Sequence, residues 1–236
     1  MRRILKACQR RFEILARQFG SRRPAQAVAI WMKQAWQLSQ RERLSLAEAL
    51  VQVDARLQAR YRRYLGRRGE HWPPVGNAPL LFCDAGLGGL ARWLWAAGQE
   101  AIWSRAQDDR QLVEQALQAG AVLLTTDTLL LERRVIRTGR LRALWIPPTL
   151  EVIEQLALVF TQLELKLATP RCMRCGGRLE QVPKATVADR IPPRTARWLD
   201  EYFLCSVCGN LFWQGTHWQQ ILNRLRTLGS TGLNDA

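Results

Sequence analysis

Residues 80–98 read LLFCDAGLGGLARWLWAAG, and this stretch decides the fold of the chain. Four apolar residues open it in the pattern of a short buried strand. Asp84 and a glycine-rich turn follow, and apolar residues then recur at helical spacing until Gly98. The stretch therefore predicts a strand, a turn and a helix, which together open an α/β domain.

The same alternation continues toward the C-terminus. Further strands are predicted at residues 101–103, 121–124 and 141–146, and helices from Asp108 to the residue before Gly120 and from Thr149 to about Leu163. Alternating strands and helices favour a parallel sheet with helices on both faces. The predicted fold class is α/β.

The chain ahead of this domain predicts helices alone. Apolar residues recur at steps of three and four in three successive segments. Ser45 and Glu48 have the spacing of a capping box at the start of the third segment. We expect a basic α-helical region over residues 1–75, with a linker at residues 67–79 that contains three prolines and two glycines.

Positive charge is concentrated in this helical region. The formal net charge of the chain is +15, and residues 1–75 contain 17 lysines and arginines against 5 acidic residues. Such asymmetry points to a polyanionic partner. Four arginines share one face of the third predicted helix and are the candidate RNA-binding residues: Arg56, Arg60, Arg63 and Arg67.

This arginine face leaves three interpretations open. The simplest is a solvated face on a helical bundle. The second is a stripe that follows RNA phosphates, with Tyr61 and Tyr64 available for stacking, and the unbalanced charge favours it. A basic amphipathic helix on anionic lipid is the lesser rival.

Acidic residues follow three of the predicted strands. Asp84 ends the first strand, Asp127 ends the third, and Asp108 and Asp109 lie after the second. Because function gathers at the carboxyl ends of parallel strands, three acidic positions should meet at one edge of the sheet. Clustered carboxylates repel one another unless a cation lies between them, and oxygen ligands suit magnesium or manganese. One or two such ions could activate a water for attack on a phosphodiester.

Each of these carboxylates also has a simpler structural interpretation. Asp108, Asp109 and Asp127 could each cap a helix. Asp84 is harder to explain in this way, since a carboxylate directly after a buried strand must find a partner. Glu132 is a candidate fourth ligand, although a glutamate on a surface helix is the simpler interpretation.

The glycine turn offers a competing function. Gly86, Gly88 and Ala91 fit G-x-G-x-x-A between a strand and a helix, which is the pattern of a dinucleotide-binding turn. That pattern expects an acidic residue at the end of the second strand, where this chain has Trp103. The charge of Asp84 also disfavours a pyrophosphate. A nucleotide-binding oxidoreductase is therefore only the third hypothesis. Under the two leading hypotheses, no small-molecule cofactor is expected.

Two C-x-x-C pairs predict a metal site near the C-terminus: Cys172, Cys175, Cys205 and Cys208. Four thiolates form a closed tetrahedral shell around zinc and leave no position open for catalysis. The 29 residues between the pairs imply an insertion, rich in proline and arginine at residues 183–197. His217 follows closely and is either a structural histidine or one that faces RNA or moves a proton.

The compartment follows from weaker signals. No run of about 18 uncharged apolar residues occurs, so no transmembrane helix is predicted. The N-terminus lacks the apolar region and cleavage site of a secretory signal, which favours the cytoplasm. Cys8 and Cys83 stand alone in helical and strand-like contexts and are expected to be small core residues.

Several short motifs resemble one known family when they are taken in order. They are Phe82–Asp84, Leu87–Leu94, Asp108–Asp109, Leu123–Asp127, Arg171–Cys175, Ile191–Pro193, Phe203–Cys205, Cys208–Gly209 and Phe212–His217. This ordered set, from about Leu81 to Leu225, is similar to the Mut-seven C-terminal RNase family. The resemblance implies a PIN-like nuclease domain over residues 79–165, a zinc ribbon with an insertion over residues 166–228, and a tail at residues 229–236.

The resemblance also implies an activity and its residues. It implies metal-dependent RNA cleavage with Asp84, Asp109 and Asp127 as ligands of magnesium or manganese. Thr126 and Arg92 fall within the matching motifs and are candidate supporting residues, as are Asp108 and His217. The family usually has an arginine where this chain has Trp95, and commonly one where it has Thr126, so less positive charge is expected beside the scissile phosphate.

Two functions are therefore weighed against each other. The leading one is a metal-dependent ribonuclease, with structural zinc and catalytic magnesium or manganese. The alternative is a non-catalytic RNA- or ribosome-binding protein. Both take RNA as the partner, with tRNA, rRNA and the ribosome as candidate forms, and neither involves a membrane.

Overall fold

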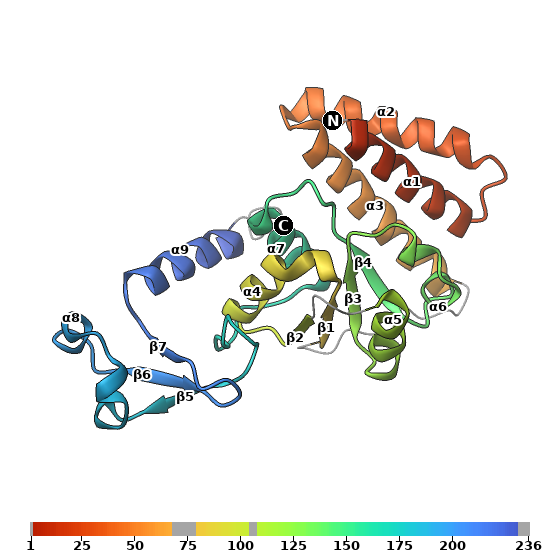
Figure 1. Ribbon diagram of the computed structural model, residues 1–236. Helices are drawn as coiled ribbons and strands as arrows, with labels where there is room; N and C mark the ends of the chain where they lie inside the picture. Colours follow the sequence, from red (N-terminus) through yellow and green to blue (C-terminus); the bar gives the residue numbers. More distant parts are fainter. Residues whose placement is uncertain (1, 68–78, 104–107, 231–236) are drawn as a thin grey trace.

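The computed structural model describes residues 2–67, 79–103 and 108–230 (Figure 1). The sequence-predicted linker falls largely on residues 68–78, and most of the tail on residues 231–236, which lie outside the described residues. Within the described part of the chain, no helix is long and apolar enough to cross a membrane.

A four-stranded parallel sheet forms the centre of the protein, with strand order β2-β1-β3-β4. Its strands are β1 (Leu81–Cys83), β2 (Ala101–Trp103), β3 (Val122–Thr125) and β4 (Arg142–Trp145). All four lie where the sequence predicts strands, and the α/β class is confirmed. Apolar residues in short runs favour strands that are buried on both faces, which is what parallel sheets require.

Helices cover both faces of this sheet (Figure 1). The segments between the strands are η1 (Ala85–Leu87), α4 (Gly88–Ala96), α5 (Asp109–Gln118), η2 (Leu130–Glu132) and α6 (Arg134–Arg137), and α7 (Val152–Leu163) follows β4. Helices α4 and α7 pack on one face, while α5 packs on the other. The start of α7 corrects the predicted cap at Thr149, because Glu151 and Glu154 form the capping box there.

Alternate strand residues divide the interior into two cores. Phe82 and Leu123 point to the face that α5 covers, whereas Cys83 and Leu124 point to the face that α4 and α7 cover. Cys83 is fully buried in the second core, as the sequence predicts. The sheet is therefore buried on both sides, and its polar side chains are confined to the strand ends.

The three N-terminal helices belong to the first of these cores. They are α1 (Arg2–Gln18), α2 (Pro24–Glu42) and α3 (Leu46–Arg67). Phe12, Leu50 and Cys8 from these helices are buried in the same cluster as Phe82 and Leu123 of the sheet. The basic helices therefore cover one face of the α/β unit and share its core.

A buried ion pair joins the first and third helices. Arg11 Nε donates to Asp54 Oδ1 at 3.1 Å, and both side chains are 6% exposed. Gln58 Nε2 donates to the other oxygen of the Asp54 carboxylate at 2.5 Å. These bonds satisfy two charges that would be costly to bury alone.

The C-terminal part contains a second, smaller sheet. Its three antiparallel strands have the order β5-β6-β7: β5 (Leu179–Val182), β6 (Tyr202–Cys205) and β7 (Leu211–Trp213). The segment between β5 and β6 folds as η3 (Lys184–Arg190) and α8 (Pro193–Ala196), and α9 (Thr216–Ser230) follows β7. Ile221 and Leu225 of α9 return to the core that α4 and α7 form.

The Arg11–Asp54 pair gives the first prediction. Asp54→Ala should lower the free energy of unfolding by about 3–5 kcal/mol, because it leaves the Arg11 guanidinium buried without a counter-charge. The double variant Arg11→Met/Asp54→Leu should recover most of that loss, since it removes both charges. Urea unfolding of the full chain measures the difference.

The matched control is Arg17→Met, which breaks the exposed pair between Arg17 and Glu13 and should change stability by less than about 1 kcal/mol. A single Asp54→Ala variant that unfolds at the wild-type urea concentration would contradict the structural role of the buried pair.

Candidate functional site

Asp84 lies at the centre of the sheet's carboxyl edge. It follows β1 directly, and its backbone N–H donates to Leu124 O of β3 at 3.0 Å. The chain leaves β1 toward β2 on one side, and β3 pairs with β1 on the other. This is the point where the strand order reverses, and open α/β sheets bind their ligands there.

Four donors surround the Asp84 carboxylate. Oδ2 accepts from Thr125 Oγ1 at 2.8 Å, from Thr126 N at 2.6 Å and from Thr126 Oγ1 at 3.1 Å. Oδ1 accepts from Gly86 N at 3.0 Å. Asp84 is 6% exposed, and these bonds offset the loss of its hydration. Thr126 thus supports Asp84 with two donors, at a position where the family that the chain resembles commonly has an arginine.

Asp127 lies on the adjoining strand end, one residue beyond Thr126. Its Oδ1 accepts from Leu129 N at 2.7 Å, and its backbone N–H donates to Thr125 Oγ1 at 3.0 Å. The side-chain bond stabilises the turn after β3, which is close to the capping role that the sequence left open. Asp127 is half-buried, and the structure brings it to the same edge as Asp84.

Asp108 and Asp109 lie at the beginning of α5, after β2. Asp108 occupies the N-cap position but makes no side-chain cap hydrogen bond, and Asp109 is the first helical residue. Both are exposed. Asp108 therefore does not cap the helix through its side chain, and Asp109 is an exposed residue of the first helical turn.

Asp84 and Asp127 follow β1 and β3, and Asp109 begins the helix after β2, but these carboxylates do not form a compact ligand set. Among the residues that the structure describes, only the four cysteines gather three or more His, Cys, Asp or Glu ligand atoms within 4.8 Å. Asp84, Asp109 and Asp127 supply hard oxygen donors, whose chemistry fits magnesium or manganese.

The glycine turn beside Asp84 is explained by packing. A Cβ at Gly88 would lie 2.5 Å from the ring of Trp103, whose Nε1 donates to Ala85 O at 3.2 Å. The amide N–H of Gly86 is taken by Asp84. Tryptophan packing and a carboxylate therefore account for the pattern that resembles a dinucleotide-binding turn. Arg92 is exposed on α4, which follows this turn.

Trp95 lies away from this edge, which corrects the expectation that its position borders the scissile phosphate. Its Nε1 donates to Ala101 O at 2.9 Å, and Ala101 pairs with Leu81, the first residue of β1. Asp84 follows the last residue of that strand. Trp95 is therefore at the opposite end of the parallel strands, where it is 4% exposed.

The four cysteines form the second site, and their sulfur atoms all lie within 4.8 Å of one another. Cys172 Sγ is 3.6 Å from Cys208 Sγ, and Cys175 Sγ is 3.5 Å from Cys205 Sγ. All four are free thiols. A tetrahedral zinc with Zn–S bonds of about 2.3 Å places its sulfurs about 3.8 Å apart, so this cluster could hold a structural metal such as zinc.

Two similar backbone turns present these thiols. In the first, Cys172 N donates to Gly177 O at 2.9 Å and Gly176 N donates to Cys172 O at 2.8 Å. The corresponding bonds within residues 205–210 measure 3.0 and 2.9 Å. A Cβ at Gly177 would lie 2.6 Å from Cys205 Sγ, so only glycine lets the two turns approach so closely.

The local environment shifts the pKa values of Cys172 and Cys205 in opposite directions. Burial raises the pKa of Cys172 to about 12. Burial also acts to raise the pKa of Cys205, but N–H groups of Cys208 and Val207 that point at its sulfur outweigh this, and its pKa falls to about 7. Aimed N–H groups of this kind stabilise a thiolate and prepare it for a metal.

The first cysteine turn rests on the α/β unit. Gly176 approaches the Trp95 ring so closely that a Cβ would lie 2.6 Å from its Nε1. Arg171 N donates to Trp95 O at 2.8 Å, and Arg171 Nε donates to Gly176 O at 2.7 Å. The position that the resemblance linked to the phosphate is thus a docking point for the cysteine cluster.

The structure describes the side chains of the predicted arginine face but not that of His217. His217 falls in the first turn of α9, but its side chain lies outside the described residues. The four arginines of the predicted RNA-binding face, at positions 56, 60, 63 and 67, are all exposed on α3. Tyr61 is only 6% exposed because its ring packs against Phe19, which corrects the expectation that it is available for stacking.

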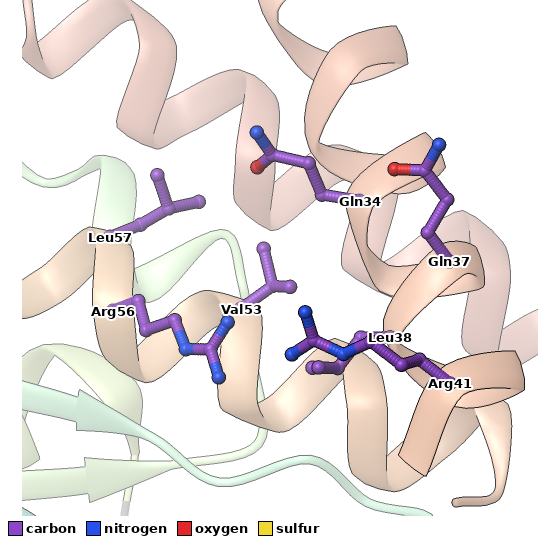
Figure 2. Close-up of a pocket in the computed structure, with 7 residues that line it drawn as sticks. All are labelled: Gln34, Gln37, Leu38, Arg41, Val53, Arg56 and Leu57. Atoms are coloured by element: carbon purple, nitrogen blue, oxygen red, sulfur yellow. The ribbon is translucent and has the colours of Figure 1, made fainter. Parts of the chain in front are cut away.

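A hollow of about 420 Å³ lies between α2 and α3 beside this arginine face. Figure 2 shows Arg41 of α2 and Arg56 of α3 extending toward one another across it. Gln34 and Gln37 lie along the α2 side of the hollow. Two guanidinium groups above an apolar floor form a surface suited to a phosphate.

Comparison with known proteins assigns most of this architecture to one family. A family model described as the Mut7-C RNAse domain matches residues 79–225. That segment contains the parallel sheet, its flanking helices, the four cysteines and part of α9. No curated protein and no solved structure matches the chain.

The cysteine cluster gives a prediction that metal analysis can check. The purified protein should contain one equivalent of zinc, and Cys175→Ser should contain far less, because a closed tetrahedral site needs all four thiolates. The variant should also unfold at a lower temperature, since metal binding stabilises the fold that presents the ligands. Elemental mass spectrometry and thermal unfolding give both readouts.

The matched control is Cys8→Ala, which removes a buried thiol from the helical core and should leave the zinc content unchanged. Full zinc content in Cys175→Ser would rule out the four-thiolate site.

Proposed function

The chain belongs to the Mut7-C RNase domain family, and on this basis we propose that it is a metal-dependent ribonuclease that cleaves RNA phosphodiester bonds. The observation that carries the proposal is the buried Asp84 carboxylate at the point where the strand order reverses. In this proposal residues 79–165 form a PIN-like nuclease domain and residues 166–228 a zinc ribbon with an insertion.

Asp84, Asp109 and Asp127 are the proposed ligands of the catalytic metal. Magnesium or manganese bound there would supply a water of lowered pKa and would neutralise charge on the phosphate. Asp84 is the fixed member of the set, because Thr125 and Thr126 donate to its Oδ2 and Gly86 N donates to its Oδ1. The exposed Asp109 and half-buried Asp127 have room to adjust their side chains around a cation.

The residues around these carboxylates have supporting roles in the proposal. Thr126 orients Asp84 through two hydrogen bonds, which is how outer partners tune a metal ligand. Asp108 adds a negative charge beside Asp109, which strengthens the attraction for a cation. Arg92 follows Asp84 closely in the sequence and is exposed on α4, so its guanidinium group can hold a substrate phosphate.

The N-terminal helices are proposed to bind the RNA backbone. Arg56, Arg60, Arg63 and Arg67 are exposed along α3, and α3 shares a core with the nuclease sheet. The hollow between Arg41 and Arg56 extends this surface onto α2 (Figure 2). The strong positive charge of this region favours RNA of any sequence, so tRNA, rRNA and the ribosome are all candidate partners.

A second candidate function is RNA or ribosome binding without cleavage. The observation that favours it is the absence of a compact carboxylate group among the described residues. In that case affinity for RNA would depend on the arginine surface alone, and no divalent metal would support turnover.

Replacement of the carboxylates separates the two functions. Asp84→Asn and Asp127→Asn should each reduce RNA cleavage to below about 1% of wild type, because each removes a charge that holds the metal. RNA affinity should change less than about twofold, since the arginine surface is intact. Gel analysis of a labelled single-stranded RNA with manganese measures cleavage, and fluorescence anisotropy measures binding.

The control for this test is Asp189→Asn, which removes an exposed carboxylate from η3 and should cleave at the wild-type rate. Undiminished cleavage by both Asp84→Asn and Asp127→Asn would exclude the proposed site. A wild-type protein that binds RNA but never cleaves it would favour the second function.

The arginine surface predicts a specific dependence on salt. Replacing Arg56, Arg60 and Arg63 together by glutamine should make the slope of log affinity against log salt concentration less negative by about 2. Each phosphate contact contributes about 0.7 to this slope for single strands. Anisotropy titrations between low and physiological salt give this slope.

Arg17→Gln serves as its control, because Arg17 is already paired with Glu13 at 2.6 Å. An unchanged slope in the triple variant would show that RNA lies on another face of the protein.

A further inference from the structure

A large cleft separates the three-stranded sheet from α8 and the start of α9. Its volume is about 950 Å³. Four aromatic side chains line it: Trp198, Phe212, Trp213 and Trp218. We propose that this cleft binds the bases of single-stranded RNA by stacking, an inference that rests on the proposed function and defines its substrate class.

The exposure of Trp198 is the first reason. This side chain is 84% exposed, whereas Trp31, Trp95 and Trp145 are each at most 9% exposed. A tryptophan that lies almost entirely in solvent contributes little to the stability of its own fold, and exposed aromatic surface marks sites of interaction. Trp198 therefore offers a large flat face for a ligand.

One wall of the cleft is held in place by packing. Trp213 lies on β7 and its ring contacts Tyr202 of β6, with centroids 6.5 Å apart. Gly215 N donates to Trp213 O at 3.0 Å, and a Cβ at Gly215 would lie 3.2 Å from the Trp213 ring. A packed aromatic wall in the same cleft as an exposed tryptophan is an arrangement that accepts bases with little loss of side-chain entropy.

The charges around the cleft favour a nucleic acid over an apolar peptide. Arg194 lines the cleft, and no carboxylate is among the described residues that line it. Arg197, next to Trp198 in the chain, is also exposed. Stacking surfaces combined with guanidinium groups suit a single strand, whose bases are free to leave the helix and whose phosphates follow the positive charge.

A second hollow extends the same wall. It has a volume of about 170 Å³ and shares Phe212, Trp213 and Trp218 with the larger cleft. Phe203, the cross-strand partner of Phe212, lines it as well. The shared tryptophans therefore present aromatic surface in two directions, which would let successive bases of one strand be held side by side.

The cleft is also connected to the nuclease unit. Ile221 lines it and is buried in the core that α4 and α7 form, and Met173 lines it and packs against the same core. Because the cysteine turn that contains Met173 docks on Trp95, the cleft has a defined position relative to the sheet. An RNA strand bound in the cleft would thus lie at a fixed distance from Asp84.

Binding to a defined oligomer tests the inference without any need for cleavage. The probe is a fluorescent 12-nucleotide oligouridylate, titrated with the zinc-loaded full chain in the absence of magnesium and manganese. Trp198→Ala should weaken binding by about 5-fold to 100-fold, because stacking contributes that much per base. Trp198→Phe should restore most of the affinity, since it keeps a ring.

Trp36→Ala is the matched control, because Trp36 is 59% exposed on α2, outside the cleft, and its removal should leave the affinity unchanged. An abasic ribose-phosphate oligomer of equal length and charge should bind weakly to wild type and equally to Trp198→Ala. A base-paired RNA should likewise be insensitive to the substitution, because its bases are already stacked.

Three outcomes would overturn the inference. The first is equal affinity of Trp198→Ala and wild type for oligouridylate, and the second is an abasic oligomer that binds as tightly as oligouridylate. The third is a Trp198→Ala defect that is confined to vesicles of phosphatidylcholine and phosphatidylserine, or to self-association by size-exclusion chromatography. Since no step requires catalysis, an inactive Asp84 site would leave this result standing, and a failed stacking test would leave the proposed nuclease intact.

Discussion

A carboxylate buried at the end of a strand must be surrounded by hydrogen-bond donors, and here the neighbouring strand supplies them. Asp84 accepts three bonds from Thr125 and Thr126 across the β1–β3 pair. They form because the parallel register sets Leu124 opposite Cys83, so that the two threonines follow at the level of Asp84. The same bonds join the carboxyl ends of the central strands and orient the acid toward the edge where a substrate would lie.

In the proposed function, two metal sites with different roles lie at opposite ends of this sheet. The carboxyl edge has oxygen donors and an incomplete ligand set, which suits a cation that exchanges and takes part in chemistry. The cysteine cluster is closed and docks through Gly176 on Trp95, near the first residues of the strands. Its metal would therefore stabilise the position of the small sheet and its aromatic cleft, while the proposed RNA cleavage would take place at Asp84 and its neighbours.

Local patterns in the sequence predict the strands, the helices and the four-cysteine cluster, because short apolar runs and C-x-x-C turns depend on neighbouring residues. The carboxylate ligands stay a prediction. Contacts between distant segments are harder to predict. The burial of Tyr61 depends on Phe19 in another helix, and the role of Trp95 depends on a glycine far along the chain. Thr126 was identified only through the resemblance, since a threonine after a strand has many uses, and its two bonds to Asp84 exist only in the folded sheet.

The central claim is that the carboxyl edge of the sheet holds a catalytic divalent cation. The most direct test is manganese binding to the zinc-loaded protein, followed by electron paramagnetic resonance as RNA cleavage is measured in the same samples. The account predicts that cleavage rises in step with occupancy of a manganese site, and that Asp84→Asn loses both together. Manganese-supported cleavage that persists in Asp84→Asn, or a manganese site that forms unchanged in that variant, would contradict it.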